Sequence, residues 1–262
     1  MSARVTMRDV AQAVGMSPMT VSRALRDDRT VSEKTRSKIR QTAQRMGYVY
    51  DTTAQAFRTQ KSGFVAVILP SINNANFAET FLAVSNGMDA AGLQMLLGST
   101  NYRVEKEEQL VRQLLARKPE ALILTGGHHT EATRDIIQAA GIPIIEMWDL
   151  PANPLGHVVG FSNGNAMTLI VDHLVERGCK KLAFVGASDG ADMRGAERRM
   201  SVMNAARTHG LPEVDVIDLG VAPVSMCDSD TAIEAFGRDV AKYDALVCVC
   251  LLYTSPSPRD RG

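Results

Sequence analysis

Cysteine is scarce in this chain of 262 residues. The only cysteines are Cys179, Cys227, Cys248 and Cys250, and none of them forms the paired two-residue spacing of a zinc site. We therefore expect reduced thiols that serve as small apolar side chains, and neither a metal nor a cofactor.

Long apolar runs are also lacking. No run is long enough to span a bilayer, and the start of the chain lacks the charged stretch, apolar core and cleavage site of a signal peptide. We therefore expect a protein of the cytoplasm with no membrane contact. Hydrophobic residues still make up 45% of the chain, which is enough to form the core of one large or two modest domains.

Net charge is zero, but the two signs are unevenly distributed. Residues 1–61 contain 12 Lys and Arg against 5 Asp and Glu, so this segment carries +7 and the remainder −7. A basic head on an acidic body is typical of a nucleic-acid-binding module attached to another domain. An ordinary solvated charged face is the simpler alternative.

Residues 9–25 have the pattern of two short helices joined by a tight turn. Thr6 can cap the first helix with Asp9 at its third position, and Gly15 can end it. Ser17 can cap the second helix, with Pro18 in the first turn, where a missing N–H is harmless. The apolar residues of each helix fall on one face, so the two helices can pack together.

The opposite face of the second helix favours DNA binding. Its short hydroxyl, apolar and arginine side chains suit base edges and phosphates in a major groove, which is where a helix-turn-helix places these positions. The residues are Pro18, Met19, Thr20, Ser22 and Arg23. The alternative is an ordinary helical hairpin inside a core.

A third helix and a hinge are expected next. Ser32 can cap a helix that runs to about Met46, before Gly47. Residues 48–58 could form a helix of about two turns capped by Asp51, which is marginal in water without a partner. This segment is therefore a candidate hinge that folds when bound.

From residue 64 the pattern alternates between strands and helices, which predicts parallel sheets covered by helices. Two successive α/β halves imply a cleft between them, with ligands at the carboxyl ends of the strands. We expect strands at 64–69, 94–97, 121–124, 143–147, 158–161, 182–185, 214–219 and 245–250. We expect helices at 76–91, 104–117, 130–140, 166–177, 194–209 and 230–242.

With these features in place, residues 4–250 resemble the LacI/GalR family of repressors. The matching motifs are Asp9-Val-Ala, Gly15-Met-Ser, Thr20-Val-Ser-Arg, Val31-Ser-Glu-Lys-Thr-Arg, Gly47-Tyr, Gly63-Phe-Val-Ala-Val-Ile-Leu-Pro, Phe77-Ala-Glu, Gly141-Ile-Pro, Arg177-Gly and Lys181-Leu-Ala-Phe-Val-Gly. Leu69-Pro-Ser-Ile-Asn-Asn and Val159-Gly-Phe-Ser-Asn most resemble the gluconate-utilisation repressors.

The resemblance implies an all-α helix-turn-helix head plus an α/β two-lobed body like a periplasmic binding protein, with parallel sheets and an incomplete second lobe. The expected parts are a DNA-binding domain at 1–48, a hinge and linker at 49–62, an effector-binding and dimerisation domain at 63–250, and a tail at 251–262. It also implies a homodimeric repressor of double-stranded operator DNA, controlled by a sugar or sugar-acid effector, with gluconate as a candidate.

The resemblance also implies which residues contact DNA. Pro18, Met19 and Arg23 take base-facing positions, and Phe57 takes the place of a smaller leucine that wedges into the minor groove. Asp51 departs from the family and would place a negative charge near phosphates. The full set of expected DNA-binding residues is Thr6, Ser17, Pro18, Met19, Thr20, Ser22, Arg23, Thr30, Ala54 and Phe57.

The effector pocket is expected to combine one arginine, hydroxyl-binding groups and an aromatic cover. Arg198 is the favoured carboxylate ligand, with Arg194 as a weaker candidate, because a guanidinium matches two oxygens at once. Asp149 and the asparagines would bind hydroxyls, and Phe77 or Trp148 would cover the apolar side. Each could instead be a satisfied polar residue beside a strand end. The set is Asn76, Phe77, Trp148, Asp149, Asn163, Arg194 and Arg198.

The sequence also contains features of three other kinds of protein or site. Gly186–Gly190 fits a nucleophile elbow around Ser188, but a hydrolase needs a later histidine as base, and the only one is His209, on the predicted helix that follows. His128 and His129 could bind a metal, but without carboxylate or cysteine neighbours we expect a surface loop. A periplasmic-type binding protein without DNA function shares the two-lobed body but would lack the head.

The final residues break the pattern. Pro256, Pro258 and the polar residues around them cannot continue a helix or a central strand. We expect a disordered or non-native tail at 251–262 in place of the family's remaining strands. Unpaired sheet edges would then weaken both dimerisation and effector binding.

Overall fold

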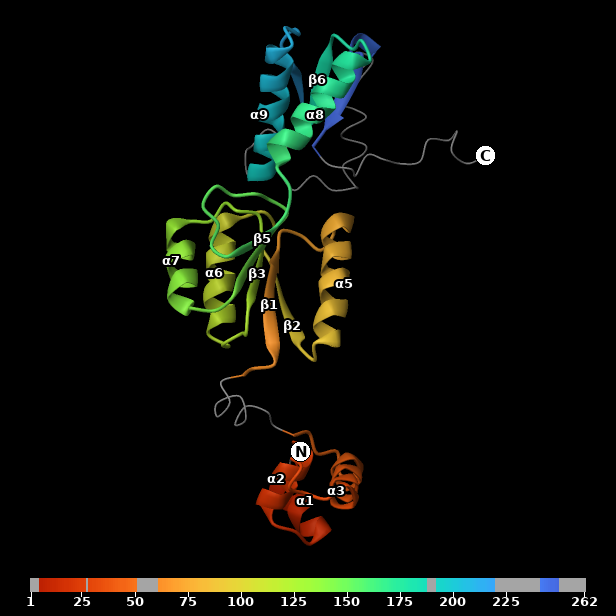
Figure 1. Cartoon of the computed structure of the whole chain (residues 1–262), viewed down its shortest axis with the longest axis vertical. Helices are drawn as coiled ribbons and strands as arrows, with labels where there is room; N and C mark the ends of the chain where they lie inside the picture. Colours follow the sequence, from red (N-terminus) through yellow and green to blue (C-terminus); the bar gives the residue numbers. More distant parts are fainter. Residues whose placement is uncertain (1–4, 27, 51–60, 188–191, 220–240, 250–262) are drawn as a thin grey trace, which may run out of the picture. The chain divides into compact units, whose positions relative to one another are not determined.

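The structure is a computed structural model, and it describes residues 5–26, 28–50, 61–187, 192–219 and 241–249. The chain divides into two compact units, residues 1–61 and residues 62–262, which we call the head and the body. Figure 1 shows the elements of each unit in sequence colours. Among the helices in these ranges, none has both the length and the apolar character needed to cross a membrane.

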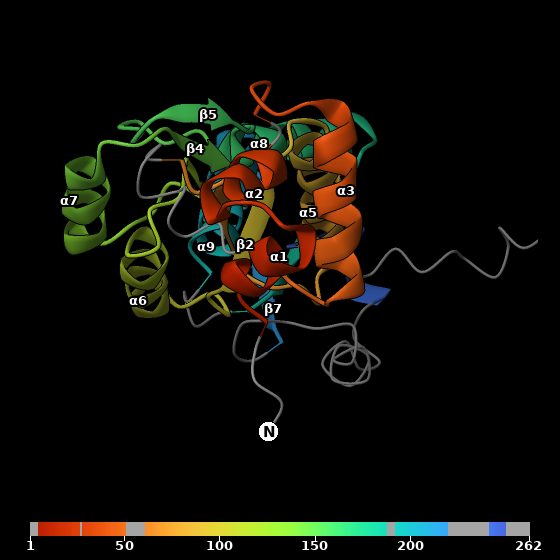
Figure 2. The same cartoon turned by 90° about the horizontal axis from the view of Figure 1, so that it is seen from below.

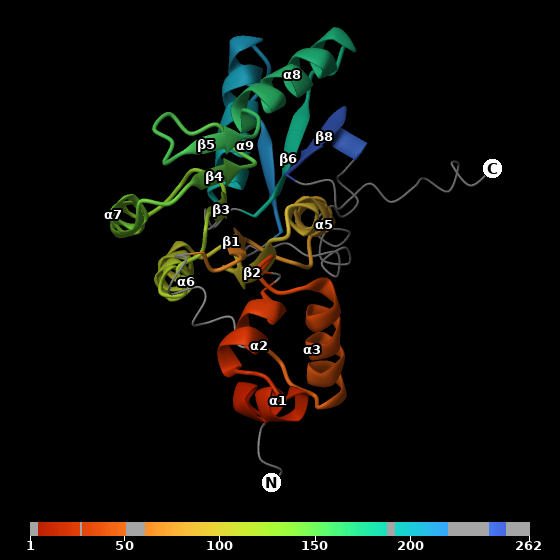
Figure 3. The same ribbon diagram turned by 60° about the horizontal axis from the view of Figure 1, so that its bottom comes forward.

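The described part of the head contains three helices, shown in Figure 3. Thr6 and Asp9 form the predicted capping box, and Gly15 ends α1 with a left-handed φ of 69°. Ser17 caps α2 by accepting a hydrogen bond from the backbone N–H of Thr20 at 3.1 Å. The helices are α1 (Met7–Val14), α2 (Pro18–Leu25) and α3 (Glu33–Arg45).

The head core confirms the predicted apolar faces. Val10, Val21, Ala24 and Ile39 are all fully buried, so each helix contributes to one cluster. Because the head is small, these few side chains supply most of its hydrophobic stabilisation.

The first lobe of the body contains a five-stranded parallel sheet in the order β2-β1-β3-β4-β5. Its central strands are mostly apolar, as expected for a sheet covered on both faces, although β4 carries the buried Glu146. The strands are β1 (Phe64–Leu69), β2 (Gln94–Ser99), β3 (Leu122–Thr125), β4 (Ile144–Met147) and β5 (His157–Val159).

Helices cover both faces of this sheet, as Figures 1 and 2 show. One face packs against α6 (Val104–Leu115) and α7 (Glu131–Ala140), and the other against α5 (Ala75–Ala90). Successive side chains of β1 point to opposite faces of the sheet. Ala66 and Ile68 pack in the core beneath α6 and α7, and Val65 and Val67 pack in the core beneath α5.

The second lobe has a three-stranded parallel sheet in the order β7-β6-β8. Helices α8 and α9 pack side by side over one face of this sheet, and Phe184 in β6 is fully buried beneath them. The elements are α8 (Asn163–Glu176), β6 (Leu182–Gly186), α9 (Met193–Thr208), β7 (Asp215–Asp218) and β8 (Ala245–Cys248).

Most expected elements are confirmed within one or two residues, but α8 begins earlier than predicted. The sequence predicts a start at Ala166, whereas Ser162 accepts a hydrogen bond from the backbone N–H of Asn165 at 3.0 Å and starts the helix at Asn163. The first turn of α8 therefore carries a candidate site residue. The predicted hinge helix and most of the helix expected at 230–242 lie outside the described residues.

The head core generates a stability prediction. Ile39→Ala should destabilise the head by about 2–5 kcal/mol, because it leaves a cavity among α1, α2 and α3. The exposed Met19→Ala is the matched control and should change stability by less than about 0.5 kcal/mol.

Urea denaturation followed by two probes would measure this effect. Far-ultraviolet circular dichroism reports both units, whereas the single tryptophan, Trp148, reports the body. Only the circular dichroism transition should shift. An equal shift of the fluorescence midpoint in Ile39→Ala would contradict independent folding of the head.

Candidate functional site

The first candidate surface is the exposed side of α2 in the head. Ser17, Pro18, Met19 and Arg23 are exposed, and Met19 has 61% of its surface accessible. An apolar side chain this exposed at the start of a helix has no role in the head core.

Several hydroxyls predicted to bind DNA also have structural partners. Thr6 Oγ1 donates a hydrogen bond to Asp9 Oδ2 at 2.7 Å, and the hydrogen bonds from Thr6 lower the pKa of Asp9. Thr30 donates from its N–H and its hydroxyl to Asp28 Oδ1, at 2.9 Å and 2.7 Å. These residues therefore shape the ends of helices and turns. Ala54 and Phe57 lie outside the described residues.

The second candidate site is a cavity in the body at the carboxyl ends of β1, β2 and β3, as predicted. The first lobe contributes residues that follow these strands, and the second lobe contributes the start of α9. The lining residues are Pro70, Thr100, Tyr102, Arg103, Val104, Glu107, Thr125, Gly126, His128, Asp192, Met193 and Arg194.

Arg194 is the buried cation of this cavity. The residue is 8% exposed, and its guanidinium carbon lies 5.2 Å from the centre of the Phe77 ring. Its Nε atom is 3.8 Å from Asp192 Oδ1. The Nη1 atom is buried and has no hydrogen-bond partner in the described part of the chain. A buried donor without a partner is costly, and a ligand could satisfy this one.

An aromatic cluster lies beside Arg194. Phe77 contacts Trp148 edge to face, with 5.5 Å between ring centres, and Trp148 contacts Phe161 at 6.1 Å. Tyr102 lies 6.4 Å from Phe77 on its other side. Trp148 has a φ of 70°, a conformation that few residues other than glycine adopt. The predicted pair Phe77 and Trp148 therefore belongs to a larger aromatic group beside Arg194, which we call the aromatic wall and of which Tyr102 lines the cavity itself.

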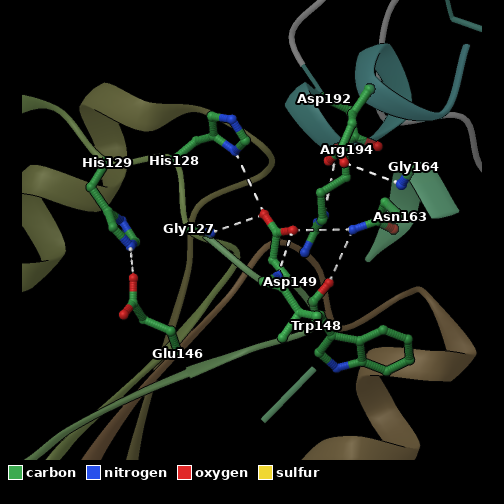
Figure 4. Close-up of polar contacts among 12 residues, drawn as sticks. Gly127, His128, His129, Glu146, Trp148, Asp149, Asn163, Gly164, Asp192 and Arg194 are labelled. Atoms are coloured by element: carbon green, nitrogen blue, oxygen red, sulfur yellow. Dashed lines mark hydrogen bonds and ion pairs between the residues drawn. The ribbon is translucent and has the colours of Figure 1, made fainter. Parts of the chain in front are cut away.

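Three predicted site residues, Asp149, Asn163 and Arg198, form a hydrogen-bonded chain between the lobes. Figure 4 shows the contacts of Asn163 with Trp148 and Asp149. Asn163 is fully buried and donates from Nδ2 to Trp148 O at 3.3 Å and to Asp149 Oδ1 at 3.4 Å. Its Oδ1 accepts a hydrogen bond from Arg198 Nε at 2.8 Å, and Arg198 Nη1 donates to Val249 O at 2.7 Å. These groups join β4 to α8 and α9.

Asp149 is held from several sides. It is 4% exposed and accepts hydrogen bonds from the N–H groups of Gly127 at 3.3 Å and Leu150 at 2.9 Å. His128 Nδ1 lies 3.7 Å from Asp149 Oδ2. A Cβ atom on Gly160 would lie 2.3 Å from Asp149 O, so only glycine allows β5 to pass this closely.

Asn76 is the remaining predicted effector residue. It lies in the first turn of α5, next to Phe77 in sequence. Its N–H donates to the capping residue Asn74 at 3.0 Å, and its carbonyl accepts from Thr80 Oγ1 at 2.7 Å. Thr80 Oγ1 also accepts from Trp148 Nε1 at 3.2 Å, so the start of α5 supports the aromatic wall.

The prediction of a surface loop without carboxylate neighbours is wrong for His129. Its side chain is fully buried, with Nδ1 2.6 Å from Glu107 Oε1 and Nε2 3.4 Å from Glu146 Oε1. Burial alone would lower the pKa of His129, but the hydrogen bond to Glu107 and the charges of Glu107 and Glu146 outweigh it and raise that pKa. The sequence could not show these contacts, because the partners are 22 and 17 residues away.

Other predicted features have mixed outcomes. Cys179 has a free thiol, whereas Cys227, Cys250 and Ser188 lie outside the described residues. His209 is the C-terminal capping residue of α9, and its Nε2 atom lies 2.6 Å from Asp172 Oδ1. Within the described ranges, no group of three or more His, Cys, Asp or Glu side chains is arranged to hold a metal ion.

A helical head with a helix-turn-helix and a body with a cavity between two α/β lobes define the architecture of a bacterial regulatory protein. Residues 6–51 match the model of bacterial regulatory proteins of the lacI family. Residues 62–250 match the model of periplasmic binding proteins and the sugar binding domain of the LacI family. The chain therefore belongs to the LacI family, whose members are transcriptional regulators rather than enzymes.

Individual relatives support this assignment. The chain is 40% identical over 184 residues to the HTH-type transcriptional regulator GntR of Pseudomonas aeruginosa, covering 70% of this chain and 54% of that protein. It is 34% identical to GntR of Escherichia coli, covering 91% of this chain and 69% of that protein. A LacI-family transcriptional regulator from Silicibacter pomeroyi superposes with a TM-score of 0.86 at 30% identity, covering 93% of this chain and 73% of that one.

The His129 cluster generates a prediction about pH. His129→Gln should destabilise the body by about 3 kcal/mol at about pH 6, because it leaves two buried carboxylates without their cation. The folded-state pKa of His129 is raised, so the stabilisation is fully present below the unfolded value of about 6.5. It is lost as the pH rises through the folded-state value.

Urea denaturation followed by Trp148 fluorescence at a series of pH values would measure the difference between the two proteins. The difference should narrow as the pH rises. His128→Gln is the matched control, because the His128 side chain is half exposed and should show little effect. If the difference in stability between wild type and His129→Gln grew with rising pH, the raised pKa of His129 would be contradicted.

Proposed function

We propose that the protein is a sequence-specific DNA-binding transcriptional repressor controlled by a small sugar acid. The observation that carries this proposal is the combination in one chain of an exposed α2 surface and a cavity with a buried, unsatisfied arginine donor. Its place of action is the cytoplasm, where chromosomal DNA lies.

DNA reading is assigned to the start of α2. In a helix-turn-helix the second helix enters the major groove with its first residues against the base edges. Pro18 and Met19 can contact apolar groups such as thymine methyls, and Arg23 can contact a base or a phosphate. A homodimer would place two heads on a near-palindromic operator, with the hinge residues Ala54 and Phe57 in the minor groove.

The proposed DNA surface can be tested without knowing the operator. A site is first selected from random double-stranded DNA with the full chain, and affinity is then measured by fluorescence anisotropy. Arg23→Ala should weaken binding by about 1–3 kcal/mol, and wild-type affinity should fall steeply with salt. Arg177→Ala removes an exposed body arginine and should have no effect. Failure to select any sequence would favour a binding protein without DNA function.

Effector binding is assigned to the cavity, with Arg194 as the carboxylate ligand. The sequence favours Arg198, but two of the Arg198 guanidinium nitrogens already donate to Asn163 and Val249. Arg194 Nη1 is buried without a partner beside the aromatic wall, an arrangement suited to an anion. The similarity to GntR proteins makes gluconate the first ligand to test.

Calorimetric titration of gluconate into the millimolar range would separate the two arginines. Arg194→Met should weaken binding by about 30-fold or more, because it deletes the proposed carboxylate ligand but keeps an apolar stem. Arg207→Met, in the last turn of the same helix, is the matched control and should bind normally. Normal binding by Arg194→Met together with loss in a folded Arg198→Met would reassign the ligand to Arg198.

A further inference from the structure

His129 has a carboxylate at each ring nitrogen. Glu107 Oε1 on α6 lies 2.6 Å from Nδ1, and Glu146 Oε1 on β4 lies 3.4 Å from Nε2. A neutral imidazole has one N–H and one lone pair, so its second nitrogen would face a carboxylate with a lone pair. The contact between Nε2 and Glu146 Oε1 is an ion-pair distance, and neither atom has a hydrogen-bond partner in the described part of the chain. Only the imidazolium form presents a proton to both carboxylates. Figure 4 shows the contact with Glu146.

The charged groups in contact with His129 are the carboxylates of Glu107 and Glu146. Glu146 is fully buried, and its Oε2 accepts hydrogen bonds from the N–H groups of Leu155 at 2.6 Å and Gly156 at 3.4 Å. The charged groups that face the imidazole are Glu107 from α6 and Glu146 from β4, whereas His128 on the same loop faces Asp149. Loss of the proton would leave two buried carboxylates without a cation, which is strongly unfavourable.

Glu107 connects this cluster to the effector cavity. It is 6% exposed, yet it lines the same cavity as Arg103 and Arg194. An unneutralised Glu107 would place a negative charge in the wall of a pocket whose buried donor is Arg194. Electrostatic effects are strong in a partly desolvated pocket, so this charge would oppose an anionic ligand.

We propose that His129 is a positioning residue of the effector site, whose imidazolium holds the Glu107 carboxylate and offsets part of the negative charge of the Glu107 and Glu146 pair so that the pocket accepts an anion. This inference rests on the proposed binding of a sugar acid in the cavity. His129 itself does not touch the ligand. It acts through Glu107, and it ties the cavity wall to β4 and to the segment that carries Leu155 and Gly156.

The test is calorimetric titration of gluconate into the full chain and three variants at about pH 6. His129→Gln should bind about tenfold more weakly, because the Glu107 carboxylate then lines the pocket without the imidazolium beside it. The double variant with Glu107→Gln should return to within about threefold of wild type, because that change removes the carboxylate. Glu107→Gln alone should bind at least as well as wild type. A role in packing alone predicts that the double variant binds no better than His129→Gln.

Two further measurements on the same proteins separate charge from packing. Wild-type affinity should fall as the pH rises through the pKa of His129, while the affinity of His129→Gln stays constant over that range. Nitrogen-15 shifts of the His129 ring in the wild type should show both nitrogens protonated at about pH 6, where the titrations are run. This second measurement needs no variant, so it remains decisive if a variant fails to fold.

The outcomes distinguish this inference from the proposed function. If the wild type binds no gluconate, both the sugar-acid assignment and the role of His129 in it are overturned. If the wild type binds gluconate but His129→Gln binds equally well, or if His129 is neutral at about pH 6, only the role of His129 is overturned.

Discussion

The side-chain amide of Asn163 joins the two lobes of the body. It donates to the end of β4 and accepts from Arg198, and both contacts are made by a residue with no exposed surface. A buried amide must satisfy its donors and its acceptor together, so the orientation of α8 relative to β4 is tightly defined. The cavity, the aromatic wall and the position of Arg194 all depend on that orientation.

Local signals made much of the fold predictable. The capping box of Thr6 and Asp9, the Ser17-Pro18 start of α2 and the ends of helices at glycine are short-range effects that a sequence shows directly. The alternation of apolar strands and amphipathic helices likewise identifies the parallel sheets. The early start of α8 is not predictable in this way. No apolar helical repeat begins directly after Ser162, so the sequence does not mark this serine as the cap of the helix.

Pairings between distant residues account for most of what the sequence did not show about the site. Phe77 and Trp148 could be nominated from the resemblance, but the contacts with Tyr102 and Phe161 depend on how several loops meet. Arg194 and Arg198 lie one turn apart on α9, and their different surroundings depend on the rotation of that helix against the first lobe. The partners of His129 come from α6 and β4, which no local pattern brings together.

The left-handed backbone at Trp148 has a consequence for how this pocket could change. A residue with a side chain in that conformation carries strain of about 1–2 kcal/mol, which glycine would relieve. Glycine would also delete the central ring of the aromatic wall. Selection for greater stability and selection for ligand recognition therefore act in opposite directions at this position. New ligand specificities would evolve more readily at neighbouring wall residues with relaxed backbones, such as Phe77 and Phe161.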